Sequence, residues 1–240
     1  MSSDITTRWV SDNIPMRENS RSDTLSPCPK TLWGAGPIFP RFSKKDVADD
    51  CVGNLLEVAR LAPSEWNLQT KRWIVVRGGA AKQYLETATC IALPLSSAPV
   101  ILICLADTLA WKSAPQYFQE MIASRKITEE EGREALRRLR DHYSSSPDVA
   151  KRTALANAFL AVHQILLSAS ECRLSAYWVT EFDEGKIKAY FHIPEHFLVA
   201  ALIPLGYHEE ASPAPLSMLH LRTKIYREKF GGSQDLFQKA

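Results

Sequence analysis

The chain has 240 residues, of which 45% are hydrophobic and 23% charged, the balance of a globular protein with one large domain or two small ones. Its formal net charge of +2 gives no electrostatic basis for nucleic acid as the main ligand. The longest uninterrupted apolar stretch, APVILICLA at residues 98–106, has about half of the roughly 20 residues that span a bilayer, so we expect no contact with a membrane.

Residues 1–40 are polar, contain several prolines and show no periodicity, which predicts an extended N-terminal arm. Its tryptophans and Phe39 indicate that parts of the arm pack on something, such as a partner subunit. The first 16 residues lack the apolar segment of a secretion signal. The five cysteines show no CxxC or Cys–His spacing, which favours a reduced, cytoplasmic protein in which Cys104 and Cys172 are small buried hydrophobic residues.

Residues 47–60 carry apolar side chains on one face and acids in the first turn, which predicts an amphipathic helix that Pro63 ends. RWIVVRGG at 72–79 predicts a buried strand closed by a Gly-Gly turn, AAKQYLETATCIAL at 80–93 a helix, and APVILICLAD at 98–107 a second buried strand.

Residues 112–153 form a charged helical excursion, and TEEEGREALRRLRDHY within it opens on Thr128 with acids in its first turn. Residues 154–172 are nearly all apolar and small, which predicts a central helix buried on most of its surface. A short strand in 174–182, a short helix in 183–193 and a third buried strand in 197–207 follow. Because the strands and helices show no regular βαβ repeat, we expect an α+β fold around one sheet.

Common catalytic motifs are missing from the sequence. VRGGAAKQ follows a strand but has neither GxGxxG nor GxxxxGK[ST] spacing, which argues against a Rossmann domain or a P-loop. The histidines form no HExxH motif and have no nucleophile elbow as a partner. In HIPEH, Pro194 breaks the helix that would align His192 and His196 as ligands. We therefore expect no metal site and no catalytic side chain from these patterns.

The segment APSEWNLQ, at residues 62–69, is unusually polar for a connection into a buried strand. It has two interpretations. In the first, it is a helix end and polar turn in which Ser64 and Asn67 satisfy free backbone groups. In the second, its hydroxyl and amides converge on a planar ligand with several hydrogen-bonding atoms on its edge, such as an isoalloxazine ring.

At this point the sequence resembles the nitroreductase family of FMN-dependent flavoproteins. The family pattern A-R-x-A-P-S-x-x-N-x-Q-P-W before a strand is matched by ARLAPSEWNLQTK before RWIVV. Later blocks agree in order and spacing: SAPVILICLAD, the apolar helix that leads into SAYWVTEFDEGKI, and FHIPEHFLVAALIPLGY. The resemblance covers residues 42 to 231. It implies a nitroreductase-like fold with a mostly antiparallel central sheet flanked by helices.

The resemblance also implies roles for individual residues at the flavin ring. Pro63, Ser64, Asn67 and Gln69 would line the ring and the ribityl chain. Thr180 and Glu181 match the loop whose backbone N–H faces flavin N5, with Glu181 standing where the family usually has glycine. Flavin N5 would carry out the chemistry, so no side chain is expected to be catalytic.

At the phosphate end, Arg222 matches the C-terminal arginine that grips the FMN phosphate, and a surface ion pair is the alternative role for it. The family places R-R-S-x-R just before the segment that matches Phe42 to Val47, but this chain has GPIFPRF, in which only Arg41 remains. The resemblance therefore implies a phosphate site that is weakened or rebuilt from other residues of the chain, as in a divergent member of the family.

The resemblance places a substrate lid in the excursion 112–153, which makes Trp111, Tyr117 and Phe118 candidates for the substrate pocket. The alternative is that these aromatic residues only pack a helical hairpin. Lys71 is a further pocket candidate, because it replaces the aromatic residue of the family's Q-P-W.

Together these inferences describe residues 41–232 as an FMN-binding domain, with residues 1–40 as its arm and 233–240 as a C-terminal tail. The expected protein is a cytoplasmic homodimer with FMN at the interface, which transfers hydride from NAD(P)H to an electron-poor small molecule in a ping-pong cycle. Two rivals stay open. One is an FMN-dependent oxidase or dehydrogenase, or an oxygen-using flavin enzyme, without NAD(P)H turnover. The other is a flavin-binding protein without catalysis.

Overall fold

The computed structural model describes residues 42–89, 94–208 and 225–231. The arm 1–40, the tail 233–240 and the candidates Arg41 and Arg222 lie outside the described residues. Within these ranges, four strands form one sheet in the order β1-β2-β4-β3, with β1 at Lys71–Val76, β2 at Val100–Asp107, β3 at Ser175–Ala176 and β4 at Phe197–Gly206. Every pairing is antiparallel, which agrees with the sheet expected from the sequence.

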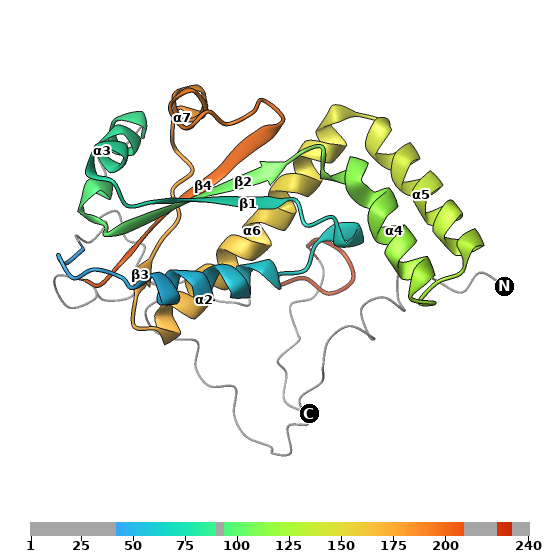
Figure 1. Cartoon of the computed structure of the whole chain (residues 1–240), viewed down its shortest axis with the longest axis horizontal. Helices are drawn as coiled ribbons and strands as arrows, with labels where there is room; N and C mark the ends of the chain where they lie inside the picture. The colour runs from blue at the N-terminus through green and yellow to red at the C-terminus, as the bar shows by residue number, and fades with distance from the viewer. Residues whose placement is uncertain (1–41, 90–93, 209–224, 232–240) are drawn as a thin grey trace, which may run out of the picture.

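The inner strand β2 is buried on both faces of the sheet. Its side chains at 101–105 alternate between two apolar clusters, as the period of a strand requires. One cluster lies under α2 (Asp49–Arg60) and α6 (Pro147–Glu171), and the other under α3 (Gly79–Ala88) and α7 (Glu184–Phe191). Figure 1 shows these two helix pairs on opposite sides of the sheet. The arrangement is the α+β fold predicted from the sequence.

The central helix α6 starts earlier than its apolar composition predicts. We expected it from Ala154, but it begins at Pro147, so residues 147–153 of the excursion are its first two turns. Ser146 accepts a hydrogen bond from the Asp148 N–H at 3.2 Å, and proline is favourable in the first turn because its missing N–H would be unpaired there.

Burial of α6 is also less complete than expected. Among the described residues it is the one helix long and apolar enough to cross a membrane by those two criteria, and 44% of its most apolar window is buried. It packs on the sheet and on α2. The opposite stripe, with Ala156, Phe159, Leu160 and His163, is exposed. An exposed apolar stripe on a core helix is a candidate contact surface.

The excursion folds as a helical hairpin beside the sheet, formed by α4 (Ala114–Ala123) and α5 (Glu129–Ser144) (Figure 1). The predicted start of α5 is confirmed by a capping box: the Thr128 hydroxyl accepts the Glu131 N–H at 3.2 Å, and the Glu131 carboxylate accepts the Thr128 N–H at 2.8 Å. The hairpin has its own apolar cluster, which also contains Leu68 from the segment before β1. The excursion is therefore packed directly against the polar APSEWNLQ segment.

Candidate functional site

The connection between α2 and β1 has a strained backbone. Residues 65–67 form a short 3-10 turn, η2 (Glu65–Asn67), and Trp66, Asn67 and Gln69 have φ values of 53°, 53° and 49°. Left-handed backbone at residues with a Cβ costs of order 1–3 kcal/mol at each position and persists only where the surroundings enforce it. Contacts on several sides of this connection, which we call the site loop (residues 63–70), supply that enforcement.

Ser64 organises the site loop from within. Its hydroxyl oxygen accepts the Gln69 N–H at 3.1 Å, and its carbonyl accepts the Asn67 N–H at 2.9 Å. This is the polar-turn interpretation for Ser64. The side chains of Asn67 and Gln69, in contrast, make no hydrogen bond within the described residues, and Asn67 is exposed. The loop thus uses its backbone groups and Ser64 internally and leaves two side-chain amides available.

Asn157 of α6 holds the site loop from below, and the sequence interpretation missed it. Its Oδ1 accepts the Glu65 N–H at 3.1 Å, and the residue is only 3% exposed. Its Nδ2 is a buried donor without a partner within the described residues. One turn earlier on α6, the Ala154 carbonyl accepts the Thr70 hydroxyl at 3.4 Å. The sequence did contain a signal for this role: Asn157 is an amide on the buried stripe of an otherwise apolar helix, and a buried polar group needs a hydrogen-bond partner.

Lys71 lies under the end of α2. Its ammonium donates a hydrogen bond to the Ala62 carbonyl at 2.6 Å, and the residue is 7% exposed. Burial lowers the pKa of this amine below its ordinary value of 10.5, because desolvation disfavours the charged form. At the position of the family's aromatic residue, this chain therefore places a buried cation that binds the carbonyl next to Pro63, away from open surface.

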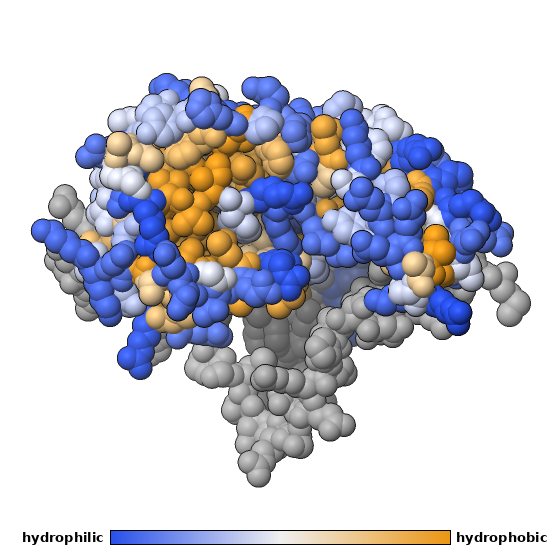
Figure 2. Space-filling view, viewed as in Figure 1, coloured by the Kyte–Doolittle hydropathy of each residue, from blue (hydrophilic) through white to orange (hydrophobic). Residues whose placement is uncertain are grey.

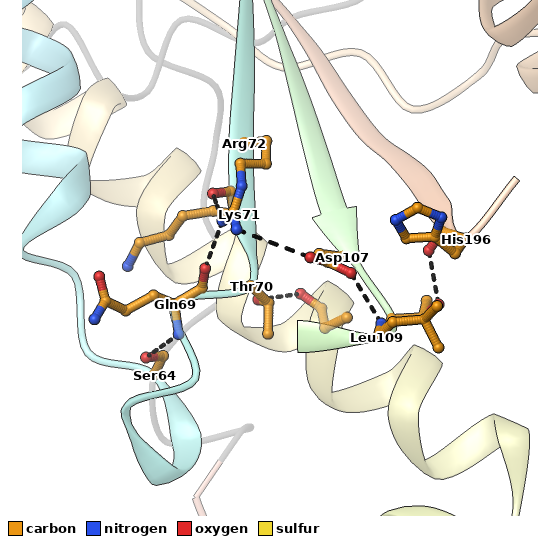
Figure 3. Close-up of polar contacts among 10 residues, drawn as sticks. Ser64, Gln69, Thr70, Lys71, Arg72, Asp107, Leu109 and His196 are labelled. Atoms are coloured by element: carbon orange, nitrogen blue, oxygen red, sulfur yellow. Dashed lines mark hydrogen bonds and ion pairs between the residues drawn. The ribbon is translucent and has the colours of Figure 1, made fainter. Parts of the chain in front are cut away.

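A second set of polar contacts joins the site loop to the neighbouring strands (Figure 3). The Arg72 guanidinium donates to the carbonyls of Gln69 and Lys71, each at 2.9 Å, and lies 3.9 Å from the Asp107 carboxylate at the end of β2. Asp107 in turn accepts the Leu109 N–H at 2.9 Å. Because the Arg72 side chain is about half exposed, its ion pair contributes little to stability, and we infer that its main role is to orient the site loop.

The aromatic candidates of the excursion lie mainly in the hairpin's interior. Phe118 is 5% exposed, with its ring 6.4 Å from that of Trp66, and Trp111 stacks on Tyr143 at 6.2 Å. Tyr117 is half-buried. Burial raises the pKa of Tyr143 to about 12. Phe118 and Trp111 thus have the packing role that the sequence left as an alternative, and through Trp66 the excursion supports the site loop.

Thr180 and Glu181 belong to a different part of the molecule. Val179 exchanges two backbone hydrogen bonds with Leu202 of β4, at 2.8 and 3.0 Å, and the Asp183 N–H donates to the Ala88 carbonyl at 2.8 Å. Thr180 and Glu181, between these anchors, are exposed, and their own N–H groups donate to no acceptor in the part of the chain that the structure describes. This backbone is therefore fixed in position and available to a ligand.

One protomer does not bring the two groups of candidates together. The site loop leads into β1, and residues 179–181 flank β4 on its far side, so β2 and β4 lie between them. Three strand spacings of about 4.8 Å separate the groups by on the order of 14 Å across the sheet. The register adds an offset along the strands, because Lys71 is level with Leu198 of β4 and Val179 pairs with Leu202. Figure 2 shows an apolar area over the sheet between α2 and the α3–α7 pair, whose places are given in Figure 1.

The family model for the nitroreductase family matches residues 41–207. The chain belongs to this family. An NADH dehydrogenase of Thermus thermophilus is 30% identical over 172 residues, which cover 71% of this chain and 82% of that protein.

Solved structures of the family share its fold. One from Exiguobacterium sibiricum, in complex with FMN, has a TM-score of 0.72 at 15% identity and covers 87% of this chain and 100% of that one. CLA-ER, an enone reductase of gut-bacterial fatty acid saturation, has a TM-score of 0.69 at 18% identity, covering 85% and 99%.

Each of the two groups of described residues has hydrogen-bonding groups that suit the ring end of an FMN. A flavin edge needs donors and acceptors, and the free amides of Asn67 and Gln69 with the N–H groups of residues 180 and 181 supply both kinds. The buried Asn157 Nδ2 is a further unpaired donor under the site loop. At the phosphate end, Arg41 and Arg222 stay predictions, because both lie outside the described residues.

The buried ammonium generates a pH-dependent prediction for Lys71→Met. The folded-state pKa of Lys71 lies below its unfolded value of 10.5. At pH values between the two, the unfolded chain therefore binds more protons at this residue than the folded chain does. The free energy of unfolding of the natural protein should therefore rise relative to that of the variant over this range, measured by urea unfolding at several pH values.

The matched control is Lys151→Met, which removes an exposed lysine. It should follow the natural protein at each pH. A difference between natural protein and Lys71→Met that is constant or falls with pH would contradict the burial of a charged amine at residue 71.

Proposed function

We propose that this protein is an FMN-dependent oxidoreductase that accepts hydride from NAD(P)H and delivers it to an electron-poor small molecule, such as a nitroaromatic compound, a quinone or an enone. The observation that carries the proposal is the site loop: a strained, internally bonded backbone that presents unpaired amides. Membership of the nitroreductase family supports it, as do the NADH dehydrogenase name of the Thermus relative and the FMN complex of the Exiguobacterium structure.

In this proposal the protein binds and orients the cofactor and the substrate, and bound FMN supplies the capacity to accept and donate hydride. Asn67 and Gln69 hold the polar edge of the ring through their amides. The backbone N–H of Thr180 or Glu181 would supply a further hydrogen-bond donor to the ring. Ser64 and Asn157 keep the loop in its left-handed conformation, so that little ordering remains when the cofactor binds.

We propose further that each FMN lies between two copies of the chain. In one protomer the two candidate groups are separated by on the order of 14 Å across the sheet and also by an offset along the strands. In the proposed dimer the site loop of one copy would face residues 179–181 of the other. The exposed stripe of α6, with Ala156, Phe159, Leu160 and His163, is the surface that a second copy would bury. His163 in this stripe is exposed in the single chain, so its imidazole would lie in the proposed interface.

The contribution of the site loop is tested by Asn67→Ala. Loss of one hydrogen bond to the flavin edge, worth about 1–1.5 kcal/mol, should raise the dissociation constant for FMN by roughly 5- to 13-fold in a fluorescence titration. Asn54→Ala is the control, because Asn54 is an exposed amide on α2 outside the site. Equal affinities of the two variants for FMN would contradict a role for Asn67 in binding the cofactor.

The reaction itself is tested by adding NADH or NADPH to the FMN-loaded protein without oxygen. The flavin absorbance at about 450 nm should decrease as the flavin is reduced, and a quinone or nitroaromatic compound should restore it. A flavin that binds but is not reduced would favour an oxidase or dehydrogenase of another substrate, or a non-catalytic flavin protein. Failure to bind FMN would contradict the proposal altogether.

The assembly is tested by Leu160→Glu, which places a charge in the exposed stripe of α6. By light scattering after gel filtration, the natural protein should have twice the chain mass of 26.9 kDa and the variant the single mass, with loss of FMN binding. Lys151→Glu, at the start of the same helix and away from the stripe, should stay dimeric. A dimeric, FMN-loaded Leu160→Glu protein would place the interface elsewhere.

A further inference from the structure

Two free cysteines lie where the start of α2 adjoins the end of α6. Cys51 is the third residue of α2, and Cys172 is the C-cap residue of α6. Figure 1 shows the start of α2 beside the end of α6, and the two helices pack on each other along the sheet. Both cysteines are free thiols, and Cys172 is the neighbouring side chain that acts on the Cys51 thiol. The two residues are more than one hundred positions apart in the sequence.

The two thiols differ in access to solvent. Cys172 is exposed, so the expectation of a buried hydrophobic role for it was wrong: the last turn of α6 extends past the core. Cys51 is half-buried against the cluster under α2 and α6. Burial, together with the neighbouring Cys172, raises the pKa of the Cys51 thiol. An oxidant therefore reaches Cys172 first, and Cys51 lies behind it as the second thiol.

We propose that Cys51 and Cys172 are a dithiol site that hydrogen peroxide oxidises to a disulfide between α2 and α6. In the first step the Cys172 sulfur attacks a peroxide oxygen, the O–O bond breaks, and the products are a sulfenic acid on Cys172 and one water. In the second step the Cys51 sulfur attacks the Cys172 sulfur, the S–O bond breaks, and the hydroxyl leaves as water with the Cys51 proton. The two thiols lose two electrons, and one hydrogen peroxide gains them.

The disulfide would act on the elements that carry the site loop. The loop begins two residues after the C-cap of α2, at Pro63, and α6 supplies Asn157 and the Ala154 carbonyl that hold it. A covalent bond at the other end of these helices restricts their relative motion and closes a long stretch of chain in the unfolded state. The oxidised protein is thus a more rigid form of the same fold.

The test uses the full chain without NAD(P)H, in the natural protein and in a Cys28→Ser, Cys90→Ser background that simplifies the pairing. After hydrogen peroxide treatment, free thiols are alkylated and the protein is digested and analysed by mass spectrometry. The expected product is a peptide pair joined through Cys51 and Cys172, removed by dithiothreitol, with a higher melting temperature before reduction. Recovery of both cysteines as separate alkylated peptides would overturn the proposal, as would a link from either to another cysteine.

Single variants test the order of the steps. In Cys51→Ser the Cys172 sulfenic acid has no second thiol and should be trapped by dimedone. In Cys172→Ser, Cys51 should give no such adduct at the same peroxide dose, and an adduct of equal yield would overturn the assignment of Cys172 as the attacking thiol. Cys104→Ser is the control, because Cys104 is fully buried in β2, and it should leave the cross-link unchanged. The outcome does not depend on flavin binding.

Discussion

The hydrogen bond from the Glu65 N–H to the buried Asn157 amide is the contact on which the candidate site depends. It fastens a backbone segment with three left-handed non-glycine residues to the most central helix of the fold. Without such a contact, the intrinsic cost of that conformation would move the segment to ordinary turn geometry. The Lys71 and Thr70 contacts act in the same direction from α2 and α6, so the loop is held on two sides.

Strain that is compensated in this way has a recognisable consequence for ligand binding. The backbone groups and Ser64 of the loop satisfy one another, while the amides of Asn67 and Gln69 remain free at its rim. A ligand that binds them meets a loop that is already ordered, which reduces the entropic cost of binding. The excursion adds to this order through the Trp66–Phe118 contact, so the helical hairpin that we expected as a substrate lid also packs against the site loop.

The sequence predicted the architecture well, because its strongest signals are apolar periodicity and helix ends. The buried strand β2, the capped start of α5 and the end of α2 before Pro63 all follow from local patterns. The support of the site did not follow, because it depends on tertiary contacts. The hydrogen bond between Asn157 and the Glu65 N–H and the hydrogen bond of Lys71 to the Ala62 carbonyl have no local sequence signature. Cys51 and Cys172 lie on helices that are far apart in the sequence, so their placement at adjoining helix ends has none either.

The most direct test is amide hydrogen exchange in the cofactor-free protein, read at residues 65–69. If the fold itself holds the loop, the N–H groups of Glu65, Asn67 and Gln69 exchange far more slowly than those of an unstructured peptide, and Asn157→Leu accelerates them while β2 stays protected. Exchange at unstructured-peptide rates in the natural protein would contradict the account, because it would mean that a ligand, not the fold, orders the loop.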